Sequence, residues 1–437
     1  MIVSDVFAGK TYAVLGLARS GLATVETLLA SGARVVAWDS QETARAQVEG
    51  RAELGDPMEI DLAGFDGIVV SPGVPLNRHP ITMRAKIAGV PIIGDIELFA
   101  LARPTLPPHK VVGITGTNGK STTTALIHHI IEQAGYPTVM GGNIGLPILS
   151  QPPLEPNLHG VGVYVLELSS YQIDLTHSLD CDVAVLLNIT PDHLDRYDGF
   201  DGYVASKARL FAMQSAEHVA IIAADDEPSR SVVVNVAGLP VLVQSADIDP
   251  VAQMTWPALQ GPHNAQNAAV AIAVAKALGI DEATIANALA SYASLPHRMQ
   301  AVGTRNGVLY VNDSKATNAA STAPALAAWP PVDGRPRIHW ILGGVAKSDN
   351  LDECFPHFAN VAHAYTIGEA GHMFADLLRP AMAVDDSEML SAAVRRAARI
   401  AQPGDVVLLS PACASFDQFR DFEARGDAFV AAVAALD

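Results

Sequence analysis

The feature that most limits how this chain can fold is a glycine-rich stretch that reads Gly113-Ile114-Thr115-Gly116-Thr117-Asn118-Gly119-Lys120-Ser121-Thr122. It follows the apolar pair Val111-Val112 and opens a helical pattern that continues to about Gln133. A strand, a glycine-rich turn and Lys-Ser at a helix start bring backbone N–H groups and the positive helix end around a polyphosphate. The stretch therefore predicts a phosphate-binding loop in an α/β domain. A glycine-rich turn that binds nothing is the alternative.

Two residues of this loop have separate expected roles. Lys120 is expected to reach the outer phosphates, and the Ser121 hydroxyl is expected to bind Mg²⁺. Ile114 stands where the longer consensus has its first glycine, so the match is to the shorter core. The nucleotide-binding residues expected in that core are Gly116, Thr117, Asn118, Gly119, Lys120, Ser121 and Thr122.

Two further predicted strands lead into residues that suit a metal and a phosphate. The apolar run 161–166 ends at Glu167, and the run 183–189 leads to His193. The carboxyl ends of parallel strands meet at one edge of a sheet, so we expect both residues to lie beside the phosphate loop. A carboxylate there is well placed to hold Mg²⁺. The alternatives are a surface glutamate and a structural histidine.

Residues 141–145 are expected to form a second flexible turn.

Length and charge set the frame for these motifs. At roughly 150 residues per domain, a chain of 437 residues predicts about three domains. The formal charge of −18 disfavours a nucleic acid or an anionic membrane as partner, because either would need a basic face. Cys181, Cys354 and Cys413 are scattered, and neither a signal-peptide pattern nor an apolar run of about 18 residues is present. We therefore expect a reduced, cytoplasmic protein without a membrane span.

The chain begins with a β-α-β pattern. A buried-strand run at 11–15 leads through a glycine-bounded turn to a helix-like run at 22–29 and to a strand at 34–38 that ends at Asp39. An acid in this position often holds a ribose hydroxyl. Ala18 replaces the middle glycine that a dinucleotide pyrophosphate needs, so another nucleotide or a sugar nucleotide is favoured over NAD. A strand at 67–70 then enters the rigid turn Ser71-Pro72-Gly73.

Two segments suggest domain boundaries. Residues 102–109 contain prolines at a density that neither a helix nor a central strand tolerates, so a new domain is expected at Lys110. A second boundary is placed near residues 294–298, and a third α/β unit begins with a strand at 307–311. The sequence thus predicts an α/β protein of three domains. These are a Rossmann-like domain at 1–104, a central P-loop domain with a mainly parallel sheet at 105–297, and a Rossmann-like domain at 298–437.

Four motifs taken together resemble the Mur ligase family. They are G-T-N-G-K-S-T at 116–122, E-L-S-S-Y-Q at 167–172, N-I-T-P-D-H-L-D-R-Y at 188–197 and S-K-A-R at 206–209. The resemblance extends over essentially the whole chain. It implies an enzyme that joins an amino acid to a UDP-muramoyl precursor of peptidoglycan by using ATP. In the family, the lysine matching Lys207 is typically carbamylated and supplies a carboxylate to the metal site. A solvated helix face is the ordinary alternative for Lys207.

The resemblance also implies roles for individual residues. The expected catalytic residues are Lys120, His193 and Lys207. The expected ligands of Mg²⁺, as two ions, are Ser121, Glu167, His193 and Lys207. ATP contacts are further expected from Asn264, Asn267, Arg298, Asp313 and Lys315, although the two asparagines also suit an ordinary capped helix. The UDP-substrate is expected to contact Ala18, Arg19, Ser20, Asp39, Ser71, Gly73, Asn143, Ser169 and Gln172.

The segment S-P-A-C-A-S-F-D-Q-F at 410–419 is similar to the branch of the family that adds D-glutamate. This implies that Lys347 and Ser415 hold the glutamate side-chain carboxylate, with Thr317 and Phe422 close to the amino acid. Val345-Ala346 departs from some relatives, which carry an acid just before this lysine. The implied reaction joins D-glutamate to UDP-N-acetylmuramoyl-L-alanine through an acyl phosphate and gives ADP and phosphate.

Two alternatives remain beside this interpretation. One is a Mur-type ligase that adds another amino acid. The other is a P-loop nucleotide hydrolase without ligation, which would explain Lys120 and Ser121 but would leave the two outer domains without a role. The expected partners are therefore small-molecule substrates, and the chain is expected to act as a monomer in precursor synthesis for the cell wall, cell shape and division.

Overall fold

The computed structural model describes residues 1–436 and has three mainly parallel β-sheets flanked by helices, which confirms the predicted α/β class. The chain divides into two compact units. The N-terminal unit contains residues 1–244 and 269–288, and the C-terminal unit contains residues 245–268 and those from 289 onward. No helix within residues 1–436 is long and apolar enough to cross a membrane.

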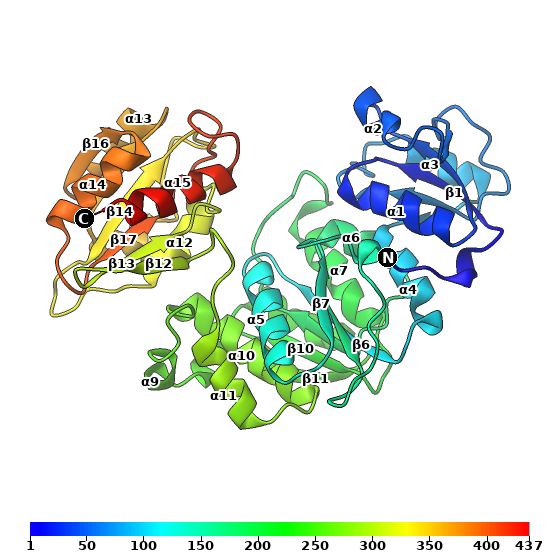
Figure 1. Cartoon of the computed structure of the whole chain (residues 1–437), viewed down its shortest axis with the longest axis horizontal. Helices are drawn as coiled ribbons and strands as arrows, with labels where there is room; N and C mark the ends of the chain where they lie inside the picture. Colours follow the sequence, from blue (N-terminus) through cyan, green and yellow to red (C-terminus); the bar gives the residue numbers. More distant parts are fainter. Residues whose placement is uncertain (437) are drawn as a thin grey trace. The chain divides into compact units, whose positions relative to one another are not determined.

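The first sheet of the N-terminal unit, which contains the strand labelled β1 in Figure 1, has the strand order β3-β2-β1-β4-β5. All pairs are parallel, so the predicted β-α-β start is confirmed. The strands are β1 (Thr11–Leu15), β2 (Arg34–Trp38), β3 (Glu53–Leu54), β4 (Gly67–Val70) and β5 (Ile92–Ile93). The helices are α1 (Arg19–Ala30), α2 (Glu42–Ala46), α3 (Ile81–Ala88) and α4 (Asp95–Ala102). Helix α1 begins at Arg19, three residues before the predicted start.

The second sheet of this unit has the order β11-β10-β9-β6-β8-β7, and all its pairs are parallel. The strands are β6 (His109–Thr115), β7 (Thr138–Gly142), β8 (Gly162–Glu167), β9 (Val183–Leu186), β10 (Val219–Ala223) and β11 (Leu239–Val243). The helices are α5 (Lys120–Gln133), α6 (Ser170–Asp174), α7 (Gly199–Ala212) and α8 (Glu227–Ser231). Strands buried on both faces need continuous apolar runs, and β8 and β9 are buried at every position.

One prediction about this sheet is wrong. Gly141 and Gly142 belong to strand β7 and not to a flexible turn. A side chain at Gly142 would put its Cβ 2.2 Å from the carbonyl oxygen of Glu167, so this glycine permits a close approach of two strands. The turn is confined to the residues that follow.

The two sheets of the N-terminal unit share a hydrophobic core. The cluster includes Phe7 and Phe99 from the first part of the chain and Tyr164 from β8, all fully buried. The proline-rich segment between the sheets is anchored, since Arg103 pairs with Asp182 at 3.2 Å and the short 3₁₀ turn Arg103–Thr105 continues from α4. Full burial of an apolar side chain such as that of Phe7 or Phe99 stabilises the folded state by about 1.5–3 kcal/mol.

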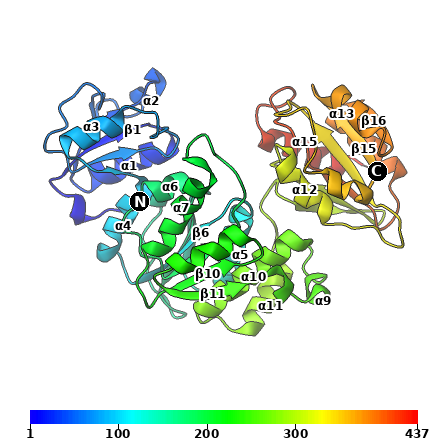
Figure 2. The ribbon, with the colours of Figure 1, turned by 180° about the vertical axis from the view of Figure 1, so that it is seen from behind.

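The third sheet lies in the C-terminal unit, where Figure 2 labels β15 and β16, and has the order β12-β13-β17-β14-β15-β16. Only the edge pair β12–β13 is antiparallel. The strands are β12 (Gln300–Arg305), β13 (Val308–Asn312), β14 (Ile338–Gly343), β15 (Val361–Ile367), β16 (Val384–Glu388) and β17 (Val406–Leu409). The helices are α12 (Ala319–Ala327), α13 (Gly371–Leu378), α14 (Leu390–Ile400) and α15 (Phe422–Ala434).

Successive residues of the central strands of this sheet serve opposite cores. Trp340 packs with α12 and α13 on one face, whereas Ile341 packs with α14 and α15 on the other. This alternation follows from the two-residue period of a strand. Along the sequence, the segment from β11 to β12 contains α9 (Pro250–Gln253), α10 (Pro262–Ala277) and α11 (Glu282–Ser291).

Candidate active site

The predicted phosphate loop joins β6 to α5 and has an unusual backbone. Gly116 and Gly119 have φ angles of 154° and 82°, which favour glycine, and a Cβ at Gly116 would lie 2.9 Å from the Cβ of Leu187. Helix α5 then begins at Lys120 without a side-chain cap at its N-terminus. The partial positive charge at such a helix end favours an anion, as expected for a phosphate-binding loop.

Asn188, in the segment after β9, holds the loop, a role that the sequence pattern did not predict. Its main-chain carbonyl accepts from the Thr117 N–H, and its side-chain oxygen accepts from the Asn118 N–H, both at 2.8 Å. The Thr117 hydroxyl also donates to the carbonyl of Thr190 at 3.2 Å. These bonds fix the loop before any ligand arrives. The only available signal was the position of Asn188 directly after a predicted strand.

Two lysines converge on the carbonyl oxygen of Gly116. Lys120 Nζ and Lys207 Nζ each donate to it at 2.9 Å, and Lys120 also donates to the Thr117 carbonyl at 2.8 Å. Lys207 is 1% exposed on α7, with its Nζ 4.5 Å from the centre of the Tyr203 ring. Burial, together with repulsion from Lys120, lowers the pKa of Lys207 to about 7. The structure thus brings two predicted catalytic residues together, and one of them is easily deprotonated.

Glu167 ends strand β8 and is 2% exposed. Its Oε1 accepts a hydrogen bond from the Asn143 side chain at 2.8 Å, while its Oε2 is buried without any partner in the part of the chain described. An unpartnered buried carboxylate oxygen is costly unless a cation or donor completes it. A hard cation such as Mg²⁺ prefers oxygen ligands, so this carboxylate fits the predicted metal site.

His193 differs from these residues because it is exposed. It has a positive φ of 52°, and its ring lies 5.1 Å from the Tyr171 ring and 6.4 Å from the Tyr203 ring. Its nearest acid is Asp192, at 3.5 Å. Within residues 1–436, no group of three or more His, Cys, Asp and Glu residues is arranged to hold a metal. A metal ion at the phosphate loop would therefore also need ligands other than His, Cys, Asp and Glu side chains.

The predicted UDP-substrate residues of the first sheet lie at the carboxyl ends of its strands. Asp39 Oδ2 accepts from the Leu17 N–H at 2.7 Å, and the Ser71 hydroxyl donates to the Gly16 carbonyl at 3.0 Å. Ala18 is the N-terminal residue before α1, Ser20 lies in its first turn, and the Gly73 turn is exposed. These contacts shape a turn at the edge where α/β folds hold ligands.

The remaining predicted UDP-substrate residues reach the second sheet. Arg19 donates to the Gly145 carbonyl at 2.8 Å, next to the turn that carries Asn143. Ser169 and Gln172 form a capping box at the start of α6, with the Gln172 N–H donating to Ser169 Oγ at 3.3 Å. Their side chains thus already have structural partners.

The predicted ATP contacts of α10 form a buried pair in the C-terminal unit. Asn267 donates to the side-chain oxygen of Asn264 at 3.0 Å, and Asn264 donates to the Gln260 carbonyl at the same distance. The prediction that the two asparagines share a helix face is confirmed. In the same unit, Lys315 Nζ lies 3.9 Å from the centre of the Phe422 ring.

Asp313 is buried at the end of β13. Its Oδ2 accepts from the Ser410 hydroxyl at 2.8 Å and its Oδ1 from the Met299 N–H at 3.2 Å. Burial raises the pKa of Asp313 to about 7, although these bonds and the nearby charge of Arg298 act in the opposite direction. Arg298 is therefore close enough to influence the Asp313 carboxyl electrostatically.

The raised pKa of Asp313 predicts a pH-dependent stability. The folded state holds a proton that the unfolded state releases near pH 4, so the free energy of unfolding should fall by about 4 kcal/mol between pH 4 and 7 through this group. Asp313→Asn should remove this part of the slope. Urea unfolding followed by tryptophan fluorescence would measure it, because three of the four tryptophans, Trp256, Trp329 and Trp340, lie in the C-terminal unit. The exposed control Asp352→Asn should keep the wild-type slope.

The predicted amino-acid residues gather at the carboxyl edge of the third sheet. Lys347 Nζ lies 3.5 Å from the Thr317 hydroxyl, and Lys347 lines a cavity of about 220 Å³ together with Asn318, the N-cap of α12. An ammonium and a helix N-terminus both favour an anion. Ser415 is 2% exposed, and Phe422 opens α15.

Arg425 organises this edge, a role that the sequence pattern did not predict. It is 1% exposed and donates to the Ser314 hydroxyl at 3.0 Å, to the Ser314 carbonyl at 2.9 Å and to the Cys413 carbonyl at 3.0 Å. It thereby ties the loop after β13 to the loop after β17. A lone arginine on an otherwise apolar helix face was its only signal, and that pattern also fits a surface residue.

The fold and the phosphate loop define an α/β protein that binds a nucleoside polyphosphate. Comparison with known proteins shows which family within this class the chain represents. The chain belongs to the Mur ligase family. It matches the MurD-like N-terminal domain over residues 10–94, the Mur ligase middle domain over 114–256 and the Mur ligase glutamate ligase domain over 297–413.

Two relatives carry the name UDP-N-acetylmuramoylalanine--D-glutamate ligase. The protein from Novosphingobium aromaticivorans is 64% identical, and the match covers 100% of this chain and 97% of that protein. The protein from Sphingopyxis alaskensis is also 64% identical, with both chains covered fully.

Solved structures agree on the fold. The Thermotoga maritima UDP-N-acetylmuramate-alanine ligase MurC is 17% identical, with 98% of this chain and 99% of that chain covered and a TM-score of 0.56. MurF from Acinetobacter baumannii is 16% identical, with 86% and 93% covered and the same TM-score.

Proposed function

We propose that this protein joins D-glutamate to UDP-N-acetylmuramoyl-L-alanine, with ATP converted to ADP and phosphate. The observation that carries the proposal is the pair of lysines on the Gly116 carbonyl beside a buried carboxylate, Glu167, that has one unpartnered oxygen. This arrangement suits a polyphosphate with its cation. The names of the 64% identical relatives supply the choice of acyl and amine substrates.

A carboxylate is a poor acyl donor and must first be activated. In the proposed reaction, the alanyl carboxylate attacks the terminal phosphorus of ATP, giving ADP and an acyl phosphate. The amine of D-glutamate then attacks the acyl carbon, the amide bond forms and phosphate leaves. Phosphoryl transfer requires mainly in-line positioning and neutralisation of charge. Lys120 at the start of α5 would neutralise charge on the transferred group.

Mg²⁺ would be held by Ser121 and Glu167, with a second ion near His193 and Lys207. When bound, Mg²⁺ neutralises phosphate charge and orients the phosphates. Lys207 would act as its carbamate, because an ammonium repels a cation and a carbamate offers oxygen ligands. The lowered pKa of Lys207 supports this role, since carbamate forms from the neutral amine.

We propose that the substrates divide among three domains at 1–104, 105–297 and 298–437. The uridine nucleotide would bind at the strand ends that carry Asp39 and Ser71. The phosphates of the adenine nucleotide would bind the phosphate loop, and Asn264, Asn267, Arg298, Asp313 and Lys315 are proposed as further ATP contacts. The protein would act as a cytoplasmic monomer. An assay of phosphate release from ATP and UDP-N-acetylmuramoyl-L-alanine with a panel of L- and D-amino acids tests the proposal.

That panel also separates the two alternatives. A ligase for another amino acid would release phosphate fastest with a different member of the panel. A nucleotide hydrolase would release phosphate without an acyl substrate and an amine. The proposal requires that release depends on both and is fastest with D-glutamate.

The choice of amino acid gives a prediction for Lys347. If Lys347 pairs with the side-chain carboxylate, Lys347→Ala should raise the KM for D-glutamate at least tenfold, because a charge-assisted hydrogen bond is lost. The KM for ATP should stay within about twofold. Steady-state kinetics with each substrate varied in turn would measure both. The exposed control Lys86→Ala should change neither, and an equal loss of ATP affinity would place Lys347 in the nucleotide site instead.

A further inference from the structure

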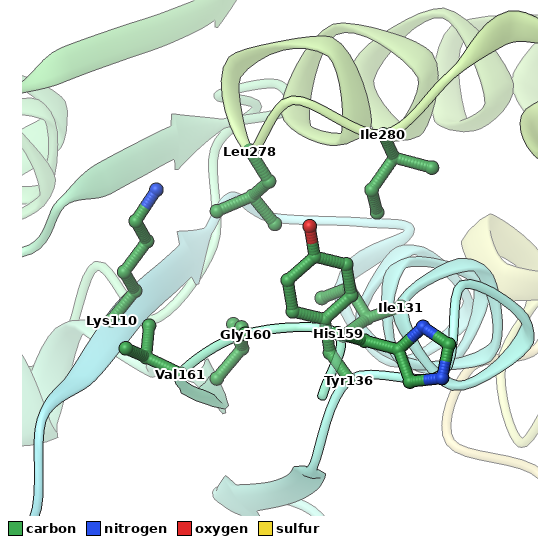
Figure 3. Close-up of a pocket in the computed structure, with 9 residues that line it drawn as sticks. Lys110, Ile131, Tyr136, His159, Gly160, Val161, Leu278 and Ile280 are labelled. Atoms are coloured by element: carbon green, nitrogen blue, oxygen red, sulfur yellow. The ribbon is translucent and has the colours of Figure 1, made fainter. Parts of the chain in front are cut away.

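Another cavity in the N-terminal unit is lined by none of the candidate site residues described above. It has a volume of about 220 Å³ and lies at the amino ends of β6 and β8. Figure 3 shows Lys110 from β6 and Tyr136 from the segment after α5 pointing toward Leu278 and Ile280. The phosphate loop follows the opposite end of β6, about 17 Å away at 3.3 Å per strand residue. The cavity is thus separate from the candidate nucleotide site.

The walls of this cavity are mostly apolar, and its polar groups are few and unpaired. Ile131, Val161, Val163, Leu278 and Ile280 supply the apolar surface. Within residues 1–436, neither Lys110 Nζ nor the Tyr136 hydroxyl has a hydrogen-bond or ion-pair partner, and no carboxylate lines the cavity. An ammonium without an acid is notable in a chain with 46 acidic and 28 basic side chains. It leaves one positive charge facing an apolar space.

The shape of the cavity depends on two glycines. A Cβ at Gly160 would lie 2.6 Å from the Tyr136 ring, and a Cβ at Gly135 would lie 2.9 Å from the His159 ring, so both rings occupy space that a larger residue would fill. Asn157 fixes the segment, because its side chain donates to the Gly135 carbonyl at 2.8 Å and accepts from the His159 N–H at 2.8 Å. The wall is therefore formed before a ligand binds, which reduces the entropic cost of binding.

We propose that this cavity binds a small monoanion with an apolar or aromatic body. The body would lie against Leu278, Ile280 and the Tyr136 ring, and the carboxylate would accept from Lys110 Nζ and from the Tyr136 hydroxyl. The volume equals that of about seven water molecules in the liquid, which admits a single ring with a short acid but no nucleotide. Sites of this kind combine an apolar lining with a few fixed polar groups.

Phenylacetate is a suitable probe, with the neutral 2-phenylacetamide as its matched control. Titration of the whole chain by calorimetry or ligand-observed NMR should give saturable binding of phenylacetate with a Kd in the millimolar range. The amide should bind at least fivefold more weakly, because it lacks the charge that Lys110 recognises. Lys110→Met keeps the side-chain stem and should weaken phenylacetate at least fivefold, while the exposed control Lys86→Met should leave it unchanged.

Two further variants locate the ligand. Tyr136→Phe removes only the hydroxyl and should weaken phenylacetate more than the amide. Leu278→Trp should fill the cavity and abolish binding of both, with circular dichroism as the check that the variant folds. The proposal is overturned if phenylacetate shows no saturable binding, if the acid and the amide bind equally, or if Lys110→Met binds phenylacetate as the wild type does.

Discussion

Replacement of Lys120 by alanine is expected to lower kcat/KM for ligation by about 10³-fold, the scale on which a single group that stabilises phosphoryl-transfer charge contributes. Lys120 opens α5 and donates to two loop carbonyls, those of Gly116 and Thr117. Its ammonium is therefore held at the turn where the phosphates are expected. Phosphate release coupled to ligation is the measurement.

Folding should survive this change, because the fully buried apolar residues of α5 are others, such as Leu126 and Ile130. Circular dichroism and thermal unfolding would check this. Lys86→Ala is the matched control, since it removes an exposed lysine from α3. Near-normal turnover of a folded Lys120→Ala variant would contradict the assignment of the phosphate loop to ATP.

Lys207→Ala is expected to lose activity by at least about 10²-fold, with partial recovery when formate or acetate is added. With an ordinary pKa of 10.5, only about one lysine in 3,000 is neutral at pH 7, whereas a pKa of about 7 leaves half of the amines neutral and able to take up carbon dioxide. The alanine variant leaves a space where a short carboxylate can replace the carbamate.

The size of the added acid and a second variant test this explanation. Short acids should restore more activity than long ones, because the space is bounded by the Tyr203 ring and the Gly116 carbonyl. Lys207→Met removes the amine but fills the space, so it should be inactive and should not recover with any acid. Full activity of Lys207→Ala, or equal recovery with acids of every length, would show that Lys207 supplies no metal ligand.

Local patterns in the sequence predicted much of the fold. Apolar runs bounded by turn residues predicted β1, β2 and β4 with the bounds that these strands have in the structure. The reason is that a buried strand needs an uninterrupted run of apolar residues. The prediction for 141–145 was wrong in its first two residues, since glycine serves close strand packing as well as turns. The α/β class and the Mur ligase family, both predicted from the motifs, are confirmed.

The sequence by itself determined the order of strand, loop and helix around Lys120, because those features depend on residues that are neighbours in the chain. Only the tertiary structure decided which distant groups meet. Lys207 reaches the Gly116 carbonyl across 91 residues, and Arg425 reaches Ser314 across 111. Burial in the folded protein also lowers the pKa of Lys207 and raises the pKa of Asp313. Desolvation depends on every element packed around a group, and a linear pattern does not contain that information.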